Sequence, residues 1–188
     1  MAKEKQKIKV VISDFDLTLV DITPIEATFK SRDKEERKQM EKVAKTLPLV
    51  SGWQTVLETL RNKNIPFLIL SNNQKNFLDK MNKWKKINAF HIIGRYGTKA
   101  TYPYTESKVP TKSVKLEQAF EILQQTYPDL QRNEILYIGD QLRDIEETKI
   151  FGGVSGGCMW CSREKEDLLN SNADYIFERP TDLLKLVG

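Results

Sequence analysis

The stretch Val10-Val11-Ile12-Ser13-Asp14-Phe15-Asp16-Leu17-Thr18-Leu19 decides the fold of this chain. Its β-branched apolar residues, followed by carboxylates, predict a buried strand that carries acids at its carboxyl end. Open α/β sheets bind ligands at that end of their strands. On an extended chain, the side chains of Asp14 and Asp16 point the same way, and their repulsion needs a cation or a shared proton to relieve it. We therefore expect a metal here, with one carboxylate attacking and the other shuttling a proton.

A second apolar run, Phe67–Leu70, predicts another strand, and it ends in Ser71-Asn72-Asn73. A serine hydroxyl at a strand end can donate a hydrogen bond to a phosphoryl oxygen, and Asn72 can assist it. The alternative is an ordinary strand-to-helix turn in which Ser71 or Asn72 caps the helix.

A third run, Ile135–Ile138, leads into Gly139-Asp140 and, four residues on, Asp144. Gly139 allows the backbone to turn tightly beside a ligand. Asp140 and Asp144 add two hard oxygen ligands of the kind Mg²⁺ prefers. The alternative is a pair of acids that cap a surface helix.

Taken in order, these segments resemble motifs I, II and IV of the haloacid dehalogenase superfamily: DxDx(T/V)(L/V), a strand-final serine, and GDxxxD. The resemblance implies that Asp14 is the nucleophile and Asp16 the general acid and base. It also implies Mg²⁺ held by Asp14, by Asp16 through its backbone carbonyl, and by Asp140, with Asp144 as a ligand or an orienting group. Because an acid stands at position 16, the resemblance favours a phosphatase over a dehalogenase.

The family's motif III is a lysine that balances the carboxylates and binds phosphate, and the sequence leaves three candidates. Lys108 precedes Val109-Pro110, which is similar to the lysine–proline entry of a helix in many members. Lys115 has the more usual spacing to Gly139, in the first turn of a helix that Ser113 could cap. Lys112 is the third candidate, and we favour Lys108 and Lys115 over it as phosphate-binding residues.

The alternation of strands and helices predicts one α/β domain over residues 1–188, a three-layer, Rossmann-like parallel sheet. The resemblance extends from Val10 to the end of the chain, and its closing segments are similar to phosphoglycolate-phosphatase-like members. A small helical insertion near residues 21–50 leaves room for only a minimal cap. The site is therefore expected to be open, or closed by a partner subunit in a homo-oligomer. Helices are expected near residues 34–45, 53–60, 77–81, 116–123, 145–151, 164–170 and 183–187, and further strands near 92–93, 154–160 and 175–177.

The mildly basic net charge of +4 favours an anionic substrate and is too small to indicate nucleic acid. We expect the partner to be a phosphorylated small molecule or a macromolecular phosphoester. No stretch has the length and apolarity of a membrane span or signal core, so a cytoplasmic protein is expected. The main alternative function is a regulatory module of the same fold that binds a phosphoryl group without turnover, although the intact Asp14/Asp16 pair argues against it.

Cys158 and Cys161 form a Cys-x-x-Cys pair, which can be a redox couple or half of a zinc site. With only His91 as a further soft ligand, the chain lacks the four ligands of a structural zinc site. We therefore expect buried structural thiols.

Overall fold

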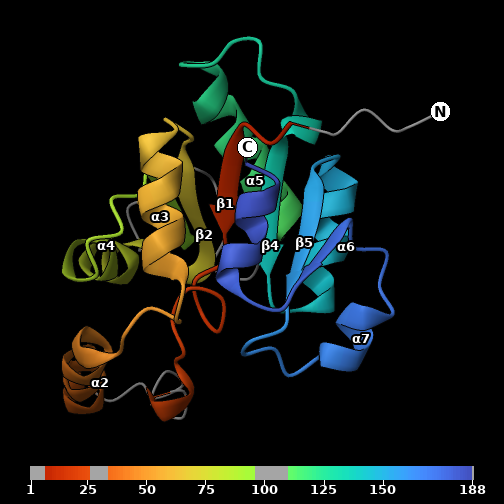
Figure 1. The fold of residues 1–188 in the computed structure, drawn as a ribbon. Coiled ribbons are helices and arrows are strands. Elements are labelled where there is room, and N and C mark those ends of the chain that lie inside the picture. Colours follow the sequence, from red (N-terminus) through yellow and green to blue (C-terminus); the bar gives the residue numbers. More distant parts are fainter. Residues whose placement is uncertain (1–6, 26–33, 96–109, 188) are drawn as a thin grey trace.

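A central parallel sheet organises the chain, whose computed structural model describes residues 7–25, 34–95 and 110–187. Its six strands are ordered β3-β2-β1-β4-β5-β6 (Figure 1). Because the chain moves outward from β1 in one direction and then from β4 in the other, the sheet has its topological switch point between these two strands, where such folds bind ligands. The strands are β1 (Val10–Ser13), β2 (Phe67–Gln74), β3 (His91–Arg95), β4 (Ile135–Gly139), β5 (Val154–Cys158) and β6 (Tyr175–Phe177).

Helices cover both faces of the sheet, which confirms the predicted three-layer α/β fold (Figure 1). They are α2 (Lys34–Thr46), α3 (Trp53–Asn62), α4 (Lys75–Trp84), α5 (Lys112–Gln124), α6 (Leu142–Phe151) and α7 (Lys165–Leu169), with 3₁₀ turns η1 (Thr23–Ile25), η2 (Arg132–Glu134) and η3 (Pro180–Lys185). Three elements differ from expectation, and one of them is β5, which ends at Cys158 instead of residue 160. Strand β2 continues through the polar residues to Gln74, and the last segment is a 3₁₀ turn instead of an α-helix.

Side chains of the central strands alternate between two apolar clusters. On β1, Val11 packs in the cluster of α3 and α4, whereas Val10 and Ile12 pack in the cluster of α5. All three are at most 1% exposed. Burying such a side chain stabilises the fold by roughly 1.5–3 kcal/mol relative to exposure. The central strand is thus anchored on both sides, which fixes the position of its carboxyl end.

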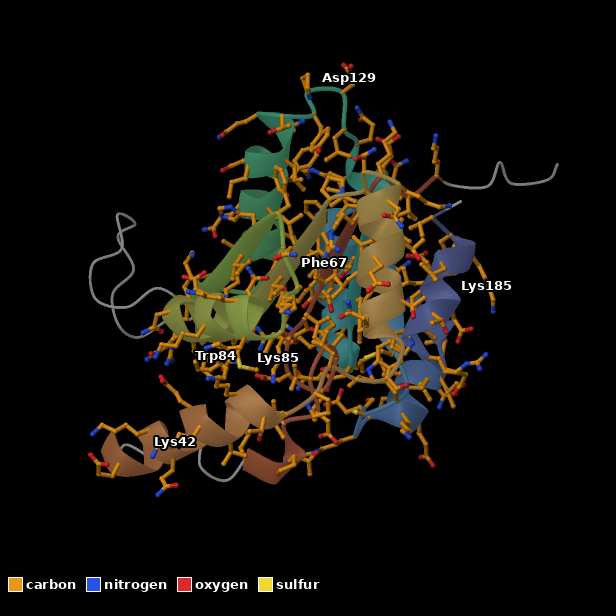
Figure 2. The ribbon with its side chains drawn as sticks, turned by 60° about the vertical axis from the view of Figure 1, so that its left-hand side comes forward. Lys42, Phe67, Trp84, Lys85, Asp129 and Lys185 are labelled. Atoms are coloured by element: carbon orange, nitrogen blue, oxygen red, sulfur yellow. The ribbon has the colours of Figure 1, made fainter. Side chains whose placement is uncertain are left out.

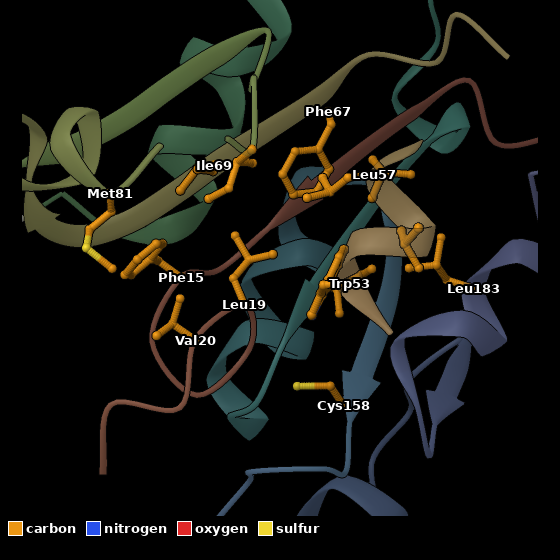
Figure 3. Close-up of a cluster of buried hydrophobic side chains, with 14 of the residues drawn as sticks. Phe15, Leu19, Val20, Trp53, Leu57, Phe67, Ile69, Met81, Cys158 and Leu183 are labelled. Atoms are coloured by element: carbon orange, nitrogen blue, oxygen red, sulfur yellow. The ribbon is translucent and has the colours of Figure 1, made fainter. Parts of the chain in front are cut away.

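The turn after β1 is also part of the core. Phe15, Leu19 and Val20 lie among side chains of α3, β2 and α4 (Figure 3). The indole groups of Trp53 and Trp160 both donate hydrogen bonds to the carbonyl oxygen of Thr18, at 2.7 and 2.9 Å. Two fixed donors on one carbonyl hold this turn rigidly at the edge of the sheet.

Helix α2 stands apart from the main body, beyond the carboxyl ends of the strands (Figures 1 and 2). Its end is tied to α4, because Lys85 donates to the carbonyl oxygens of Lys45 and Leu47 and Lys80 pairs with Glu41. Among the described residues, every helix is too short or too polar to cross a membrane.

Candidate active site

Three buried carboxylates converge at the carboxyl edge of the sheet. Asp14 follows β1, Asp140 follows β4, and Asp144 lies in the first turn of α6; their oxygens lie within 4.8 Å of one another. The backbone N–H of Asp14 donates to the carbonyl oxygen of Ile138, which joins the ends of β1 and β4. The sequence thus placed these three acids on elements that the fold brings together.

Lys112 is the cation of this cluster. Its Nζ atom donates to Oδ2 of Asp14 at 2.5 Å and also to Oδ1 of Asp144. The ammonium lies 5.6 Å from the centre of the Tyr137 ring on β4, and Lys112 as a whole residue is 5% exposed. Burial alone would lower the pKa of Lys112, but the carboxylates of Asp14 and Asp144 outweigh it and hold that pKa well above its ordinary value.

Lys115 lies one helical turn further along α5 and contacts the end of β2 instead. Its Nζ atom donates to the backbone carbonyl of Ser71 at 2.8 Å and to Oδ1 of Asn72 at 2.7 Å. Burial, together with the charge of Lys112, lowers the pKa of Lys115 to about 8. The third candidate, Lys108, lies outside the described residues. Of the two lysines that can be placed, the one ranked lower from the sequence contacts Asp14.

The start of α5 explains this arrangement. Thr111, and not the expected Ser113, is the N-cap, and its hydroxyl accepts from the backbone N–H of Val114. Lys112 is therefore the first helical residue, and Lys112 and Lys115, three positions apart, share one face of the helix. The carboxylate of Glu147 on α6 accepts from the backbone N–H of Ser113 at 3.0 Å, which fixes the end of α5 relative to α6.

The carboxyl group of Asp16 is not part of the cluster of three. The side-chain amide of Asn73 donates to its two oxygens, at 2.9 and 2.8 Å. Directly after Asp16, Leu17 adopts a φ of 56°, which is uncommon for a residue with a side chain. This position agrees with the expectation that Asp16 reaches the metal through its backbone carbonyl, because the cluster of three carboxylates does not include its side chain. Asn73 was missed, although it stands in the same Ser-Asn-Asn motif.

Gly139 is required by close packing. A Cβ atom built at this position would lie 2.1 Å from Oδ2 of Asp144. That carboxylate needs the space, because the same oxygen accepts from the backbone N–H of Gln141 at 3.1 Å while the other accepts from Lys112. Asp144 therefore caps α6 and orients Lys112 at once.

Negative charge is in excess at the cluster. Burial, with the charges of Asp14 and Asp144, raises the pKa of Asp140 to about 7. Burial also raises the pKa of Asp144, although Lys112 opposes the shift. One ammonium cannot neutralise three carboxylates, and three hard oxygen donors within reach of one point suit a divalent cation such as Mg²⁺. The residues present therefore fit the expected metal.

The two cysteines are free thiols in the structure. Cys158, at the end of β5, is fully buried and its Sγ lies 3.6 Å from the hydroxyl of Thr18, whereas Cys161 is half-buried. Burial raises the pKa of both thiols, so neither has the low pKa of a reactive cysteine.

A parallel sheet with buried acids and a lysine at its switch point has the architecture of a Rossmann-like α/β enzyme. The chain belongs to the haloacid dehalogenase-like hydrolase family, whose sequence profile matches residues 25–153. A curated relative, phosphoglycolate phosphatase of Synechococcus elongatus, is 24% identical over 75% of the chain and 60% of the relative. The match therefore spans less than two thirds of that relative's length.

Two further similarities agree with the family. Pyrophosphatase PpaX of Anoxybacillus flavithermus is 24% identical over 88% of this chain and 76% of its own. A solved haloacid dehalogenase-like hydrolase of Streptococcus pneumoniae superposes with a TM-score of 0.72 at 21% identity, covering 96% of this chain and 99% of the other. The last similarity concerns the fold alone.

Proposed function

We propose that this protein hydrolyses a phosphate monoester through a covalent aspartyl phosphate on Asp14. The observation that carries the proposal is the contact of Lys112 with Asp14 inside a cluster of three buried carboxylates. A buried nucleophilic carboxylate beside a fixed cation is the arrangement that in-line attack on a phosphoryl group needs. Membership of a hydrolase family, and the phosphatase names of the curated relatives, support the same reaction.

In the first step, a carboxylate oxygen of Asp14 attacks phosphorus. The bond from phosphorus to the leaving oxygen breaks, and its electron pair stays on that oxygen, which takes a proton from the carboxyl group of Asp16. Lys112 binds the phosphoryl oxygens as charge shifts toward them.

In the second step, water replaces the alcohol. The carboxylate of Asp16 takes a proton from the water as its oxygen attacks phosphorus. The bond between phosphorus and Asp14 breaks, which releases inorganic phosphate and restores both carboxyl groups to their starting states. One residue thus serves as acid and then as base.

We assign the phosphate-binding role to Ser71, Asn72, Lys112 and Lys115, with Lys108 as a further candidate. Ser71 lies in the polar second half of β2, and the Lys115 ammonium contacts its backbone carbonyl as well as the side-chain oxygen of Asn72. Mg²⁺ would be held by Asp14, Asp140 and the backbone carbonyl of Asp16. Asp144 would position the Lys112 ammonium. When bound, Mg²⁺ supplies positive charge that offsets the negative charge of the transferred phosphoryl group.

For the substrate, we propose a small phosphorylated molecule. The names of the two curated relatives, a phosphoglycolate phosphatase and a pyrophosphatase, support this class. Because the segment around α2 is small, the alternatives are a larger phosphoester bound in an open site and a site closed by a second subunit. A screen of small and large phosphoesters tests the first alternative.

The test is turnover of p-nitrophenyl phosphate with Mg²⁺ by wild type and by Asp14→Asn. Loss of a covalent nucleophile costs several decades in rate, so the variant should remain folded and retain less than about 1% of wild-type activity. A wild type without turnover on any phosphate monoester, or an active Asp14→Asn, contradicts the proposal.

A further inference from the structure

The side-chain amide of Asn73 donates to both oxygens of the Asp16 carboxyl group at nearly equal distances. Its Nδ2 atom lies 2.9 Å from one oxygen and 2.8 Å from the other, so one amide group meets both. A carboxylate offers about four lone-pair sites, and Asn73 uses one on each oxygen. The contact therefore fixes the position of the Asp16 carboxyl group relative to β2.

Asn73 is itself held in place from two sides. Its backbone N–H donates to the hydroxyl of Ser71 at 3.2 Å. On the neighbouring strand, Gly94 allows the polar end of β2 to approach, since a Cβ there would lie 2.9 Å from the carbonyl oxygen of Asn73 and 2.8 Å from Cα of Lys75. The register between β2 and β3 shifts between Leu70 and Gln74, which brings the half-buried Asn73 to the sheet edge.

We propose that Asn73 is a positioning residue that orients the carboxyl group of Asp16 for proton transfer. This inference rests on the proposed hydrolysis. As the bond from phosphorus to the leaving oxygen breaks, that oxygen keeps the electron pair and takes the proton of Asp16. Asn73 donates to Asp16 throughout and is not consumed. The rate enhancement that Asn73 provides is therefore larger for leaving groups that depend more strongly on protonation.

A purely structural role of Asn73 would have a different kinetic effect. If Asn73 only held β2 against the turn after β1, its loss would shift the phosphoryl site and slow every substrate alike. An orienting role slows substrates whose leaving groups need protonation and spares those whose leaving groups depart as anions. Leaving-group dependence therefore separates the two roles.

The experiment compares p-nitrophenyl phosphate with p-methoxyphenyl phosphate, which are of similar size and differ in how strongly the leaving oxygen needs a proton. Release of the phenol in the first turnover is followed by rapid quench, so that the later water step does not contribute. The variants are Asn73→Leu, which is close in size and lacks donors, and Asn73→Ala. The matched control is Gln74→Leu, because Gln74 is the next residue and is exposed.

For both Asn73 variants we expect a drop of about tenfold to hundredfold with p-methoxyphenyl phosphate, part of the usual contribution of a general acid, and less than about threefold with p-nitrophenyl phosphate. Gln74→Leu should match wild type on both. In a double-mutant cycle, Asp16→Asn with Asn73→Leu should be no slower than Asp16→Asn alone, because the two residues act as one unit.

Equal losses on both substrates, or additive effects in the cycle, overturn the orienting role while hydrolysis itself stands. A wild type that releases neither phenol overturns the proposed hydrolysis and this inference with it. An Asn73→Leu protein that does not fold leaves Asn73→Ala to give the same comparison, since a half-buried polar residue tolerates truncation better than replacement.

Discussion

The ammonium of Lys112 lies 2.5 Å from Oδ2 of Asp14, although the two residues are 98 positions apart in the chain. The same ammonium also contacts Asp144, so one side chain from α5 joins the end of β1 to the start of α6. An ion pair this deeply buried is costly to break, because loss of one partner leaves the other charge buried and uncompensated. The contact therefore bears on both stability and turnover.

We predict that Lys112→Met lowers turnover of p-nitrophenyl phosphate by about two decades or more, the scale of losing a key electrostatic stabiliser. Without Mg²⁺ it should also lower the free energy of unfolding by about 3–5 kcal/mol, measured by urea denaturation. Lys83→Met on the exposed face of α4 is the matched control and should change neither quantity appreciably. A Lys112→Met enzyme with near wild-type turnover would return the role to Lys108 or Lys115.

How far the sequence predicts this site depends on the element that carries each residue. Asp14 and Asp140 follow apolar runs that the sequence predicts as strands of one parallel sheet, so both acids were expected at its carboxyl edge, and the pairing of β1 with β4 brings them together. Lys112 depends on where α5 begins, and a shift of the N-cap from Ser113 to Thr111 moves this lysine from before the helix onto its inner face. Boundaries of this kind are set by local hydrogen bonds that periodicity does not report.

The role of Asn73 could not be predicted from the sequence for a related reason. The strand signal of β2 ends at Leu70, whereas the strand itself runs on through polar residues to Gln74 because β3 pairs with it across a register shift. That pairing depends on Gly94, 21 positions later, and no local pattern around Asn73 indicates it. The motif predicted a polar strand end, and tertiary packing decided which of its residues faces Asp16.

Gly139→Ala should disable the site by steric clash. The added Cβ would lie 2.1 Å from the Asp144 carboxylate, which has to move away from both Lys112 and Gln141. We expect turnover to fall at least tenfold and the melting temperature to drop by several degrees, the usual effect of overpacking by about 1–3 kcal/mol. Gly157 pairs with Gly139 across the sheet and serves as the control, because a Cβ there meets side-chain tips, those of Ile176 at 3.0 Å, Leu168 at 3.3 Å and Ile145 at 3.8 Å. Equal effects of the two substitutions would contradict a specific role for Asp144.

Lys115 should make phosphate binding depend on pH. Since its pKa is lowered to about 8, the amine loses its charge as the pH rises through that value, and KM should rise there with little change in kcat.

The effect of the lowered Lys115 pKa on folding stability has the opposite direction. Between about 8 and the ordinary 10.5 the unfolded chain binds more protons than the folded protein at this group, so the free energy of unfolding contributed by Lys115 increases with pH. Lys115→Met should raise KM at neutral pH and abolish both dependences, and a KM that stays flat up to about pH 9 in wild type would count against the assignment.

Binding of Mg²⁺ should depend on Asp140 in a way that pH reveals. Burial and the neighbouring carboxylates raise the pKa of Asp140 to about 7. In the metal-free protein the stability that comes from its proton is fully present below the unfolded value of about 4 and is lost as the pH rises through about 7. Mg²⁺ competes with that proton, so the gain in melting temperature on adding Mg²⁺ should be several degrees near pH 8 and much smaller near pH 5.5. Asp140→Asn should lose most of the gain at both pH values, whereas Asp129→Asn, an exposed acid in the loop far from the site (Figure 2), should keep it. A gain in Asp140→Asn as large as in wild type would show that the metal binds elsewhere.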